Sequence, residues 1–245
     1  MMMSLPQSDN LWLGLVIGNS RLHWAKFQGH LLLNYWDTDY LDPQYDHEDQ
    51  TIPILLASVV PQQTQLWQQL PQVKVITLAD LPLNNLYPTL GIDRALAVLG
   101  LGVKYGWPAL MIDGGTALTF TGVDGDKHLI GGAILPGLKL QFSTLSQRTA
   151  ALPDIEIPSN LPSRWGLETP SAIESGITYT ILAGIKDFIE AWLKDFHNST
   201  IAITGGDRQI LLTYLKSEYP DLATQIKLMP EAIFQGLLEV YLNQA

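Results

Sequence analysis

The alternation of apolar and polar residues divides the chain into short strands and amphipathic helices. The first apolar run ends at the small polar turn Gly18-Asn19-Ser20, and an alternating run follows at 22–27. This pattern predicts a buried strand, a tight turn and a returning strand. It recurs at 109–123, where the turn is Gly114-Gly115-Thr116. Asp124-Gly125-Asp126 then predicts a hairpin turn into a third strand, so we interpret its acids as turn residues rather than metal ligands.

The two blocks align at an offset of 97 positions, which places Gly115 on Gly18 and Thr116 on Asn19. Segments with helical spacing of apolar residues are 93–105, 139–148, 171–196, 208–215 and 231–242. Strands that alternate with helices predict an α/β fold, and the repeated block predicts a duplicated unit. We therefore expect two similar domains, residues 1–108 and 109–245, with a ligand cleft between them.

Composition excludes several classes of protein. The chain has 245 residues, of which 47% are hydrophobic and 16% charged, so it can bury a large core. A net charge of −10 argues against a nucleic-acid partner, because phosphate recognition requires a basic surface. The absence of cysteine excludes disulfides, thiol catalysis and Cys-ligated metals, and it favours a cytoplasmic protein. No apolar run approaches the ~20 residues of a membrane-spanning helix, so we expect no membrane partner.

The familiar nucleotide-binding motifs are missing. The sequence contains no P-loop and no dinucleotide-binding fingerprint, and its five histidines form no metal-binding pair. A tight turn can hold phosphate instead, because it exposes successive N–H groups and its small residues allow close approach. Gly18-Asn19-Ser20 and Gly114-Gly115-Thr116 fit this role or that of ordinary hairpins. Gly205-Gly206-Asp207 could seat an adenosine or be a plain strand-to-helix turn.

Three charged residues, Asp113, Asp93 and Arg94, each have two interpretations. Asp113 ends a predicted strand, where it could either form the turn or bind a cation beside phosphates. Asp93 begins a predicted helix, where it could either be the N-cap or act as the base that accepts a proton from an attacking hydroxyl. Arg94 could clamp a carboxylate or phosphate, or form a surface ion pair. The segment 37–50 carries six acids without repeated ligand spacing, so we interpret it as a solvated loop after a third strand at 31–35.

Together the motifs resemble those of type III pantothenate kinase. The motifs are IGNS at 17–20, GIDR at 91–94, IDGGTALT at 112–119, GGAILPG at 131–137 and RTAALP at 148–153. The resemblance implies membership of the acetate/sugar kinase, heat-shock chaperone and actin superfamily, with two duplicated ribonuclease-H-like domains and a homodimer. It also implies ATP-dependent phosphorylation of pantothenate, the first step of coenzyme A biosynthesis, with Mg²⁺ and with K⁺ or NH₄⁺.

The resemblance assigns roles to individual residues. Asp93 would accept the proton of the pantothenate hydroxyl, and Asp113 would bind the monovalent cation. The residues that would contact pantothenate are Tyr87, Gly91, Ile92, Arg94 and Thr169. The residues that would bind ATP are Gly18, Asn19, Ser20 and Thr116.

One position departs from the family pattern. The first motif usually begins with an acidic residue, and here that place holds Val16. An apolar side chain binds neither Mg²⁺ nor its water shell, so Mg²⁺ would be held by the ATP phosphates and another carboxylate. We expect an active kinase because the other motifs are intact. Two alternatives stay open: a non-catalytic nucleotide-binding regulator, and a kinase for another small hydroxylated metabolite.

Overall fold

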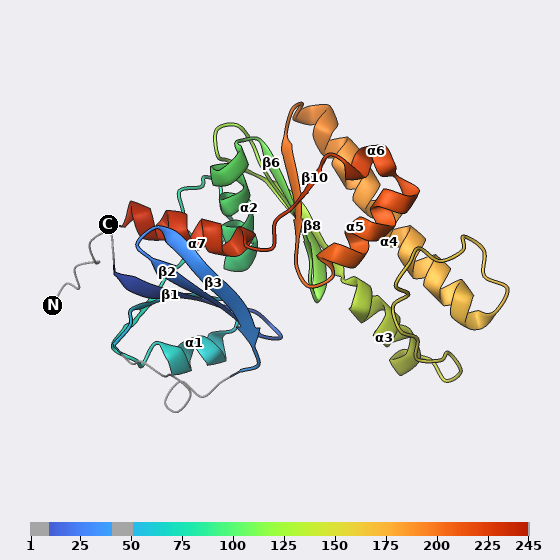
Figure 1. Cartoon of the computed structure of the whole chain (residues 1–245), viewed down its shortest axis with the longest axis horizontal. Helices are drawn as coiled ribbons and strands as arrows, with labels where there is room; N and C mark the ends of the chain where they lie inside the picture. The colour runs from blue at the N-terminus through green and yellow to red at the C-terminus, as the bar shows by residue number, and fades with distance from the viewer. Residues whose placement is uncertain (1–9, 41–50, 245) are drawn as a thin grey trace. The chain divides into compact units, whose positions relative to one another are not determined.

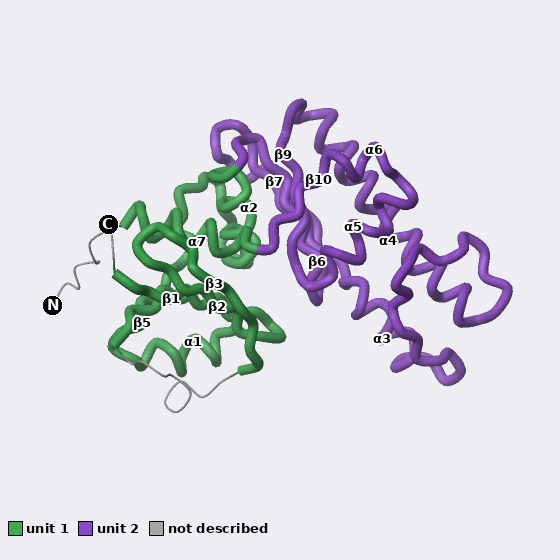
Figure 2. The backbone as a smooth tube through the Cα atoms, viewed as in Figure 1, with its two compact units in different colours: residues 1–104, 231–245 green, residues 105–230 purple. Residues whose placement is uncertain are grey.

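The structure is a computed structural model that describes residues 10–40 and 51–244 (Figure 1). The chain separates into two compact units, residues 1–104 with 231–245 and residues 105–230 (Figure 2). The sequence predicts a boundary after residue 108 with the last helix in the second domain, whereas this helix belongs to the first unit. No helix within the described residues combines the length and hydrophobicity that a membrane span requires.

The first unit contains a five-stranded sheet in the order β3-β2-β1-β4-β5. Its strands are β1 (Leu11–Ile17), β2 (Leu22–Gln28), β3 (Leu31–Thr38), β4 (Ile54–Ser58) and β5 (Val73–Val75). The first three strands are antiparallel, and β4 and β5 run parallel to β1. The helices are α1 (Pro61–Trp67), the 3-10 turn η1 (Leu78–Asp80), α2 (Ile92–Tyr105) and α7 (Ala232–Asn243).

The second unit repeats this topology with the order β8-β7-β6-β9-β10. Its strands are β6 (Ala109–Gly114), β7 (Ala117–Val123), β8 (Leu129–Pro136), β9 (Thr200–Thr204) and β10 (Ile226–Leu228). Its helices are α3 (Leu138–Arg148), α4 (Thr169–Asp195), α5 (Arg208–Glu218) and α6 (Pro220–Ala223). Strands β6 to β8 are antiparallel, and β9 and β10 are parallel to β6. The matching order and directions confirm the predicted duplication.

The third strand is longer than the apolar pattern predicts. β3 continues to Thr38, which pairs with Leu22, so Asp37 lies in a strand and not in a loop. The alternation is lost because β3 is an edge strand whose residues are mostly exposed, although Trp36 stacks on Trp24 across the sheet. Residues 41–50 of the predicted acidic loop lie outside the described residues.

The two faces of the first sheet are covered by different helices (Figure 1). Leu13, Leu15 and Ile17 form one cluster with Trp67 of α1. The alternate residues of β1 face α7, where Trp12 stacks on Tyr241 with ring centroids 4.2 Å apart. Strand residues alternate between the two faces of a sheet, so Val16 lies on the α7 side with Trp12.

Candidate functional site

The turn between β1 and β2 is tight and open to solvent. The N–H of Gly18 donates to the carbonyl oxygen of Arg21 at 3.0 Å, and the Gly18 carbonyl accepts a hydrogen bond from the Tyr40 hydroxyl at 2.7 Å. Asn19 and Ser20 are exposed between these two anchors. The geometry is that of a small, fixed turn that an anion can approach.

Asp93 lies in the first turn of α2, one residue beyond the first helical residue, and not at an N-cap. Its Oδ1 accepts a hydrogen bond from the N–H of Arg94 at 2.8 Å. Burial raises the pKa of the Asp93 carboxyl, and the N–H and charge of Arg94 oppose this shift. A carboxylate with a raised pKa is a stronger proton acceptor, which suits a general base. A Cβ on Gly91 would lie 2.4 Å from Asp93 Oδ1, so glycine leaves room for this carboxylate.

The three residues Arg94, Tyr87 and Ile92 near Asp93 differ in how far their side chains are exposed to solvent. Arg94 is buried, and its Nη1 donates to the hydroxyl of Tyr87 at 3.2 Å. Tyr87 is exposed, whereas the side chain of Ile92 is buried in the core. Ile92 therefore offers its backbone, and Tyr87 its ring, to a ligand near Asp93. The structure thus brings together four of the five residues expected to contact pantothenate.

The second unit gathers the other phosphate-binding and cation-binding candidates at the end of β6. Gly205 has a φ of +89°, and a Cβ there would lie 2.3 Å from Asp113 Oδ1. The N–H of Asp207 donates to the Gly114 carbonyl at 2.7 Å, and the N–H of Gly137 donates to the Thr116 carbonyl at 2.9 Å. The backbones of three turns therefore meet beside the Asp113 carboxylate.

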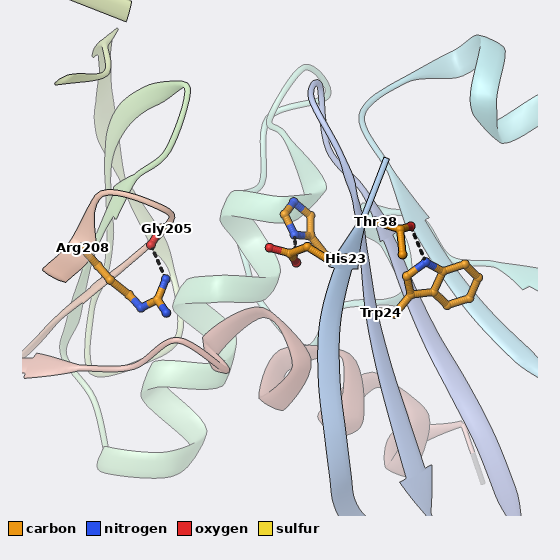
Figure 3. Close-up of polar contacts among 6 residues, drawn as sticks. His23, Trp24, Thr38, Gly205 and Arg208 are labelled. Carbon is orange, nitrogen blue, oxygen red and sulfur yellow. Dashed lines mark hydrogen bonds and ion pairs between the residues drawn. The ribbon is translucent and has the colours of Figure 1, made fainter. Parts of the chain in front are cut away.

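Asp207 and Arg208 continue this group. Burial raises the pKa of the Asp207 carboxyl, and the N–H and charge of Lys139 oppose the shift. Arg208 Nη1 donates to the Gly205 carbonyl at 2.7 Å (Figure 3). Two hydrogen bonds therefore fix the strand-to-helix turn, one to the Gly114 carbonyl and one from Arg208. A Cβ on Gly206 would meet nothing within 4 Å, so a flat ligand can approach the backbone there.

Thr169, the fifth residue expected to contact pantothenate, belongs to the second unit. It begins α4, where Glu168 and Ser171 form a capping box. It lines a cavity of about 440 Å³ with apolar and small residues of the α3 and α4 region: Leu145, Leu152, Ala172, Ile173, Gly176 and Ile177. The other four residues expected to contact pantothenate belong to the first unit.

Comparison with known proteins identifies the family. A family model described as type III pantothenate kinase matches residues 12–191. The chain belongs to the type III pantothenate kinase family. It is 49% identical over 263 aligned positions to a relative of that name from Nostoc sp., covering 96% of this chain and 95% of the relative. A relative of the same name from Synechocystis sp. is 50% identical over 234 positions, covering 94% and 90%.

Solved structures show the fold. A putative Baf family transcriptional activator from Campylobacter jejuni has a TM-score of 0.65 at 20% identity, covering 95% of this chain and 98% of that one. The activator of 2-hydroxyisocaproyl-CoA dehydratase from Clostridium difficile, solved with bound ADPNP, has a TM-score of 0.52 at 10% identity, covering 96% and 94%. With the repeated sheet topology, these likenesses confirm two duplicated ribonuclease-H-like domains.

One cluster of potential metal ligands lies outside these groups. Ligand atoms of Asp124, Asp126 and His128 lie within 4.8 Å of one another, within the part of the chain that the structure describes. Asp124 Oδ1 accepts hydrogen bonds from the N–H groups of Asp126 and His128 at 2.9 and 2.8 Å. Asp124 therefore closes the predicted hairpin turn between β7 and β8.

The sequence does not predict the contact between His23 and Asp37. His23 Nδ1 lies 2.7 Å from Asp37 Oδ1, linking β2 to β3 (Figure 3). Only the strand register could have revealed it: the Gly18 turn places Val16 opposite His23, and β3 places Asp37 opposite His23. The strand predicted at 31–35 ends before Asp37, so the sequence pattern alone does not pair Asp37 with His23.

Proposed function

We propose that this protein transfers the γ-phosphoryl group of ATP to pantothenate, giving 4'-phosphopantothenate in the first step of coenzyme A biosynthesis. Membership of the type III pantothenate kinase family over residues 12–191 is the observation that carries this function. Sequence identity near one half, over most of both chains, supports it. The buried carboxylate at the start of α2 supplies the group that the chemistry needs.

Asp93 is the proposed general base. The primary hydroxyl oxygen of pantothenate attacks the γ-phosphorus, the bond to the β–γ bridging oxygen breaks, and ADP leaves. Asp93 accepts the hydroxyl proton, and the N–H bond from Arg94 holds the carboxylate in place. Phosphoryl transfer depends mainly on positioning and charge stabilisation, so one oriented base is sufficient proton chemistry.

The remaining predicted residues bind the two substrates. Gly18, Asn19, Ser20 and Thr116 would contact ATP. Tyr87, Gly91, Ile92, Arg94 and Thr169 would contact pantothenate. Arg94 lies beside Asp93 and its Nη1 donates to the Tyr87 hydroxyl at 3.2 Å, which supports a role for the guanidinium in binding the pantothenate carboxylate.

The two implied cations fit the chain unequally. The Asp113 carboxylate, beside the backbone of Gly205 and Gly114, is an oxygen ligand suited to K⁺ or NH₄⁺, which would offset phosphate charge. Val16 is fully buried and apolar, so this end of β1 offers no carboxylate to Mg²⁺. Mg²⁺ would therefore be held by the ATP phosphates and by a carboxylate outside β1. The homodimer and the cytoplasmic location remain predictions.

A coupled assay tests the function. We expect ADP release that requires pantothenate, with Mg²⁺ present, and a faster rate in K⁺ than in Na⁺. Mass spectrometry of the product should show one added phosphate. No pantothenate-dependent turnover, under conditions where the protein is folded, would overturn the proposal.

Val16 favours a second candidate, a nucleotide-binding regulator without catalysis. Calorimetric binding of ATP with no product from pantothenate would support that alternative. Turnover with a different alcohol from a substrate panel would instead identify a kinase for another hydroxylated metabolite.

A further inference from the structure

Val16, His23 and Asp37 form one row across the first sheet. Val16 pairs with His23 in the β1–β2 register, and His23 pairs with Asp37 in the β2–β3 register. Directly opposed residues of antiparallel strands project from the same face, so the three side chains lie side by side. The α7 side of the sheet therefore carries an imidazole and a carboxylate next to the apolar Val16.

The His23 ring faces the turn at the end of β1. A Cβ built on Gly18 would lie 3.1 Å from His23 Nε2, so this nitrogen lies directly over the turn. The opposite ring nitrogen, Nδ1, is held by Asp37. His23 also acts electrostatically on Asp93, because its positive charge lowers the pKa of that carboxyl. The ring thus lies over the candidate phosphate turn, close enough to the candidate base to act on it electrostatically.

We propose that His23, oriented by Asp37, binds a phosphate oxygen of ATP through Nε2 at the Gly18-Asn19-Ser20 turn. The inference deepens the proposed function and rests on it. An imidazolium donates from both ring nitrogens, so it can hold the Asp37 carboxylate and a phosphate oxygen together. Asp37 is a positioning residue, since it acts through His23. The pair places a cationic donor beside the position where Val16 offers no metal ligand.

Exposure of the pair agrees with ligand binding more than with a structural role. The side chains of His23 and Asp37 are 37% and 48% exposed, so a ligand can reach them. An exposed ion pair contributes little to stability, since water and salt screen it. Substitution at either residue should therefore leave the fold intact and affect nucleotide binding.

Steady-state kinetics with separate ATP and pantothenate titrations test the inference. H23A should raise the KM for ATP about tenfold or more, the factor for one lost charge-assisted hydrogen bond, and leave the pantothenate KM within about twofold. H23K should recover much of the loss because it restores a positive charge. D37N should raise the ATP KM by a smaller factor, and D37N should add nothing in the H23A background.

His128 provides a matched control. It is also a partly exposed histidine whose Nδ1 faces a carboxylate, 3.4 Å from Asp124 Oδ2, but it lies at the other end of β7 from Thr116. H128A should leave both KM values unchanged. An ATP KM of H23A within twofold of the wild type, or equal increases in both KM values, would overturn the role assigned to His23.

Binding measurements separate this inference from the kinase proposal. If the wild type shows no pantothenate-dependent turnover, the proposed function fails. Calorimetry with a non-hydrolysable ATP analogue still tests His23 in that case. At least tenfold weaker binding by H23A than by the wild type or H128A would support the inference, and equal binding would refute it.

Discussion

The crossing of α2 and α7 depends on two glycines that leave no room for a side chain. A Cβ on Gly100 would lie 2.0 Å from the Ala232 carbonyl oxygen, and a Cβ on Gly236 would lie 2.0 Å from the Leu96 carbonyl oxygen. Both obstacles are backbone atoms, which cannot rotate away. The substitution G100A therefore forces α7 to move by roughly 1 Å before the contact becomes acceptable.

The expected cost follows from two opposing effects. Displacing packed elements costs about 1–3 kcal/mol, and the severity of this overlap places G100A near the upper end. Alanine is favoured over glycine in a helix by about 1 kcal/mol, which offsets part of the cost. We expect a net loss of about 2 kcal/mol, or about 4–8 °C in Tm for a chain of this length.

Gly184 supplies a matched control for this prediction. It also lies inside a helix, α4, and a Cβ there would meet nothing within 4 Å. G184A should therefore raise Tm by a few degrees, through helix propensity alone. Thermal unfolding followed by circular dichroism measures both variants. If G100A melts at or above the wild-type temperature while G184A is stabilised, the tight crossing is refuted.

Three further predictions concern the site. D93N should lower kcat by about 10²–10⁴-fold in the coupled assay; because burial raises the pKa of Asp93, wild-type activity should fall on acidification at a pH above the ordinary aspartate range. D113N should remove the rate difference between K⁺ and Na⁺, and persistence of that difference would exclude Asp113 as the cation ligand. Y87F removes the hydroxyl that accepts from Arg94 and should raise the pantothenate KM a few-fold, with the ATP KM as the internal control.

Local patterning predicted most of the strands, because alternation and glycine turns are properties of neighbouring residues. It predicted the duplicated strand–turn–strand blocks and the position of Asp93 near a helix start. It did not predict that α7 packs on α2, since that contact joins Gly100 to Gly236 across most of the chain. The His23–Asp37 pair escaped notice for a related reason: it depends on the register of an exposed edge strand that has no apolar period.

The repeat allows the row of residues at the first turn to be compared with the matching row of the second sheet. At the offset of 97 positions, Val16 of β1 corresponds to Asp113 of β6. The row in the second sheet reads Asp113, Thr119 and Ile134 across β6, β7 and β8, whereas the row in the first sheet reads Val16, His23 and Asp37. The carboxylate thus lies on the central strand of one sheet and the edge strand of the other.

Distance decides what each arrangement can do. A carboxylate on the central strand, like Asp113, is beside its own glycine turn and can bind a cation there directly. A carboxylate two strands away, like Asp37, reaches the turn only through the imidazole between them. Under the proposed roles, the first unit would stabilise phosphate with the hydrogen-bonded imidazolium of His23, and the second would bind a cation directly through Asp113. Matching positions of the two duplicated sheets would therefore offset phosphate charge in two different ways, by an imidazolium in the first and by a bound cation in the second.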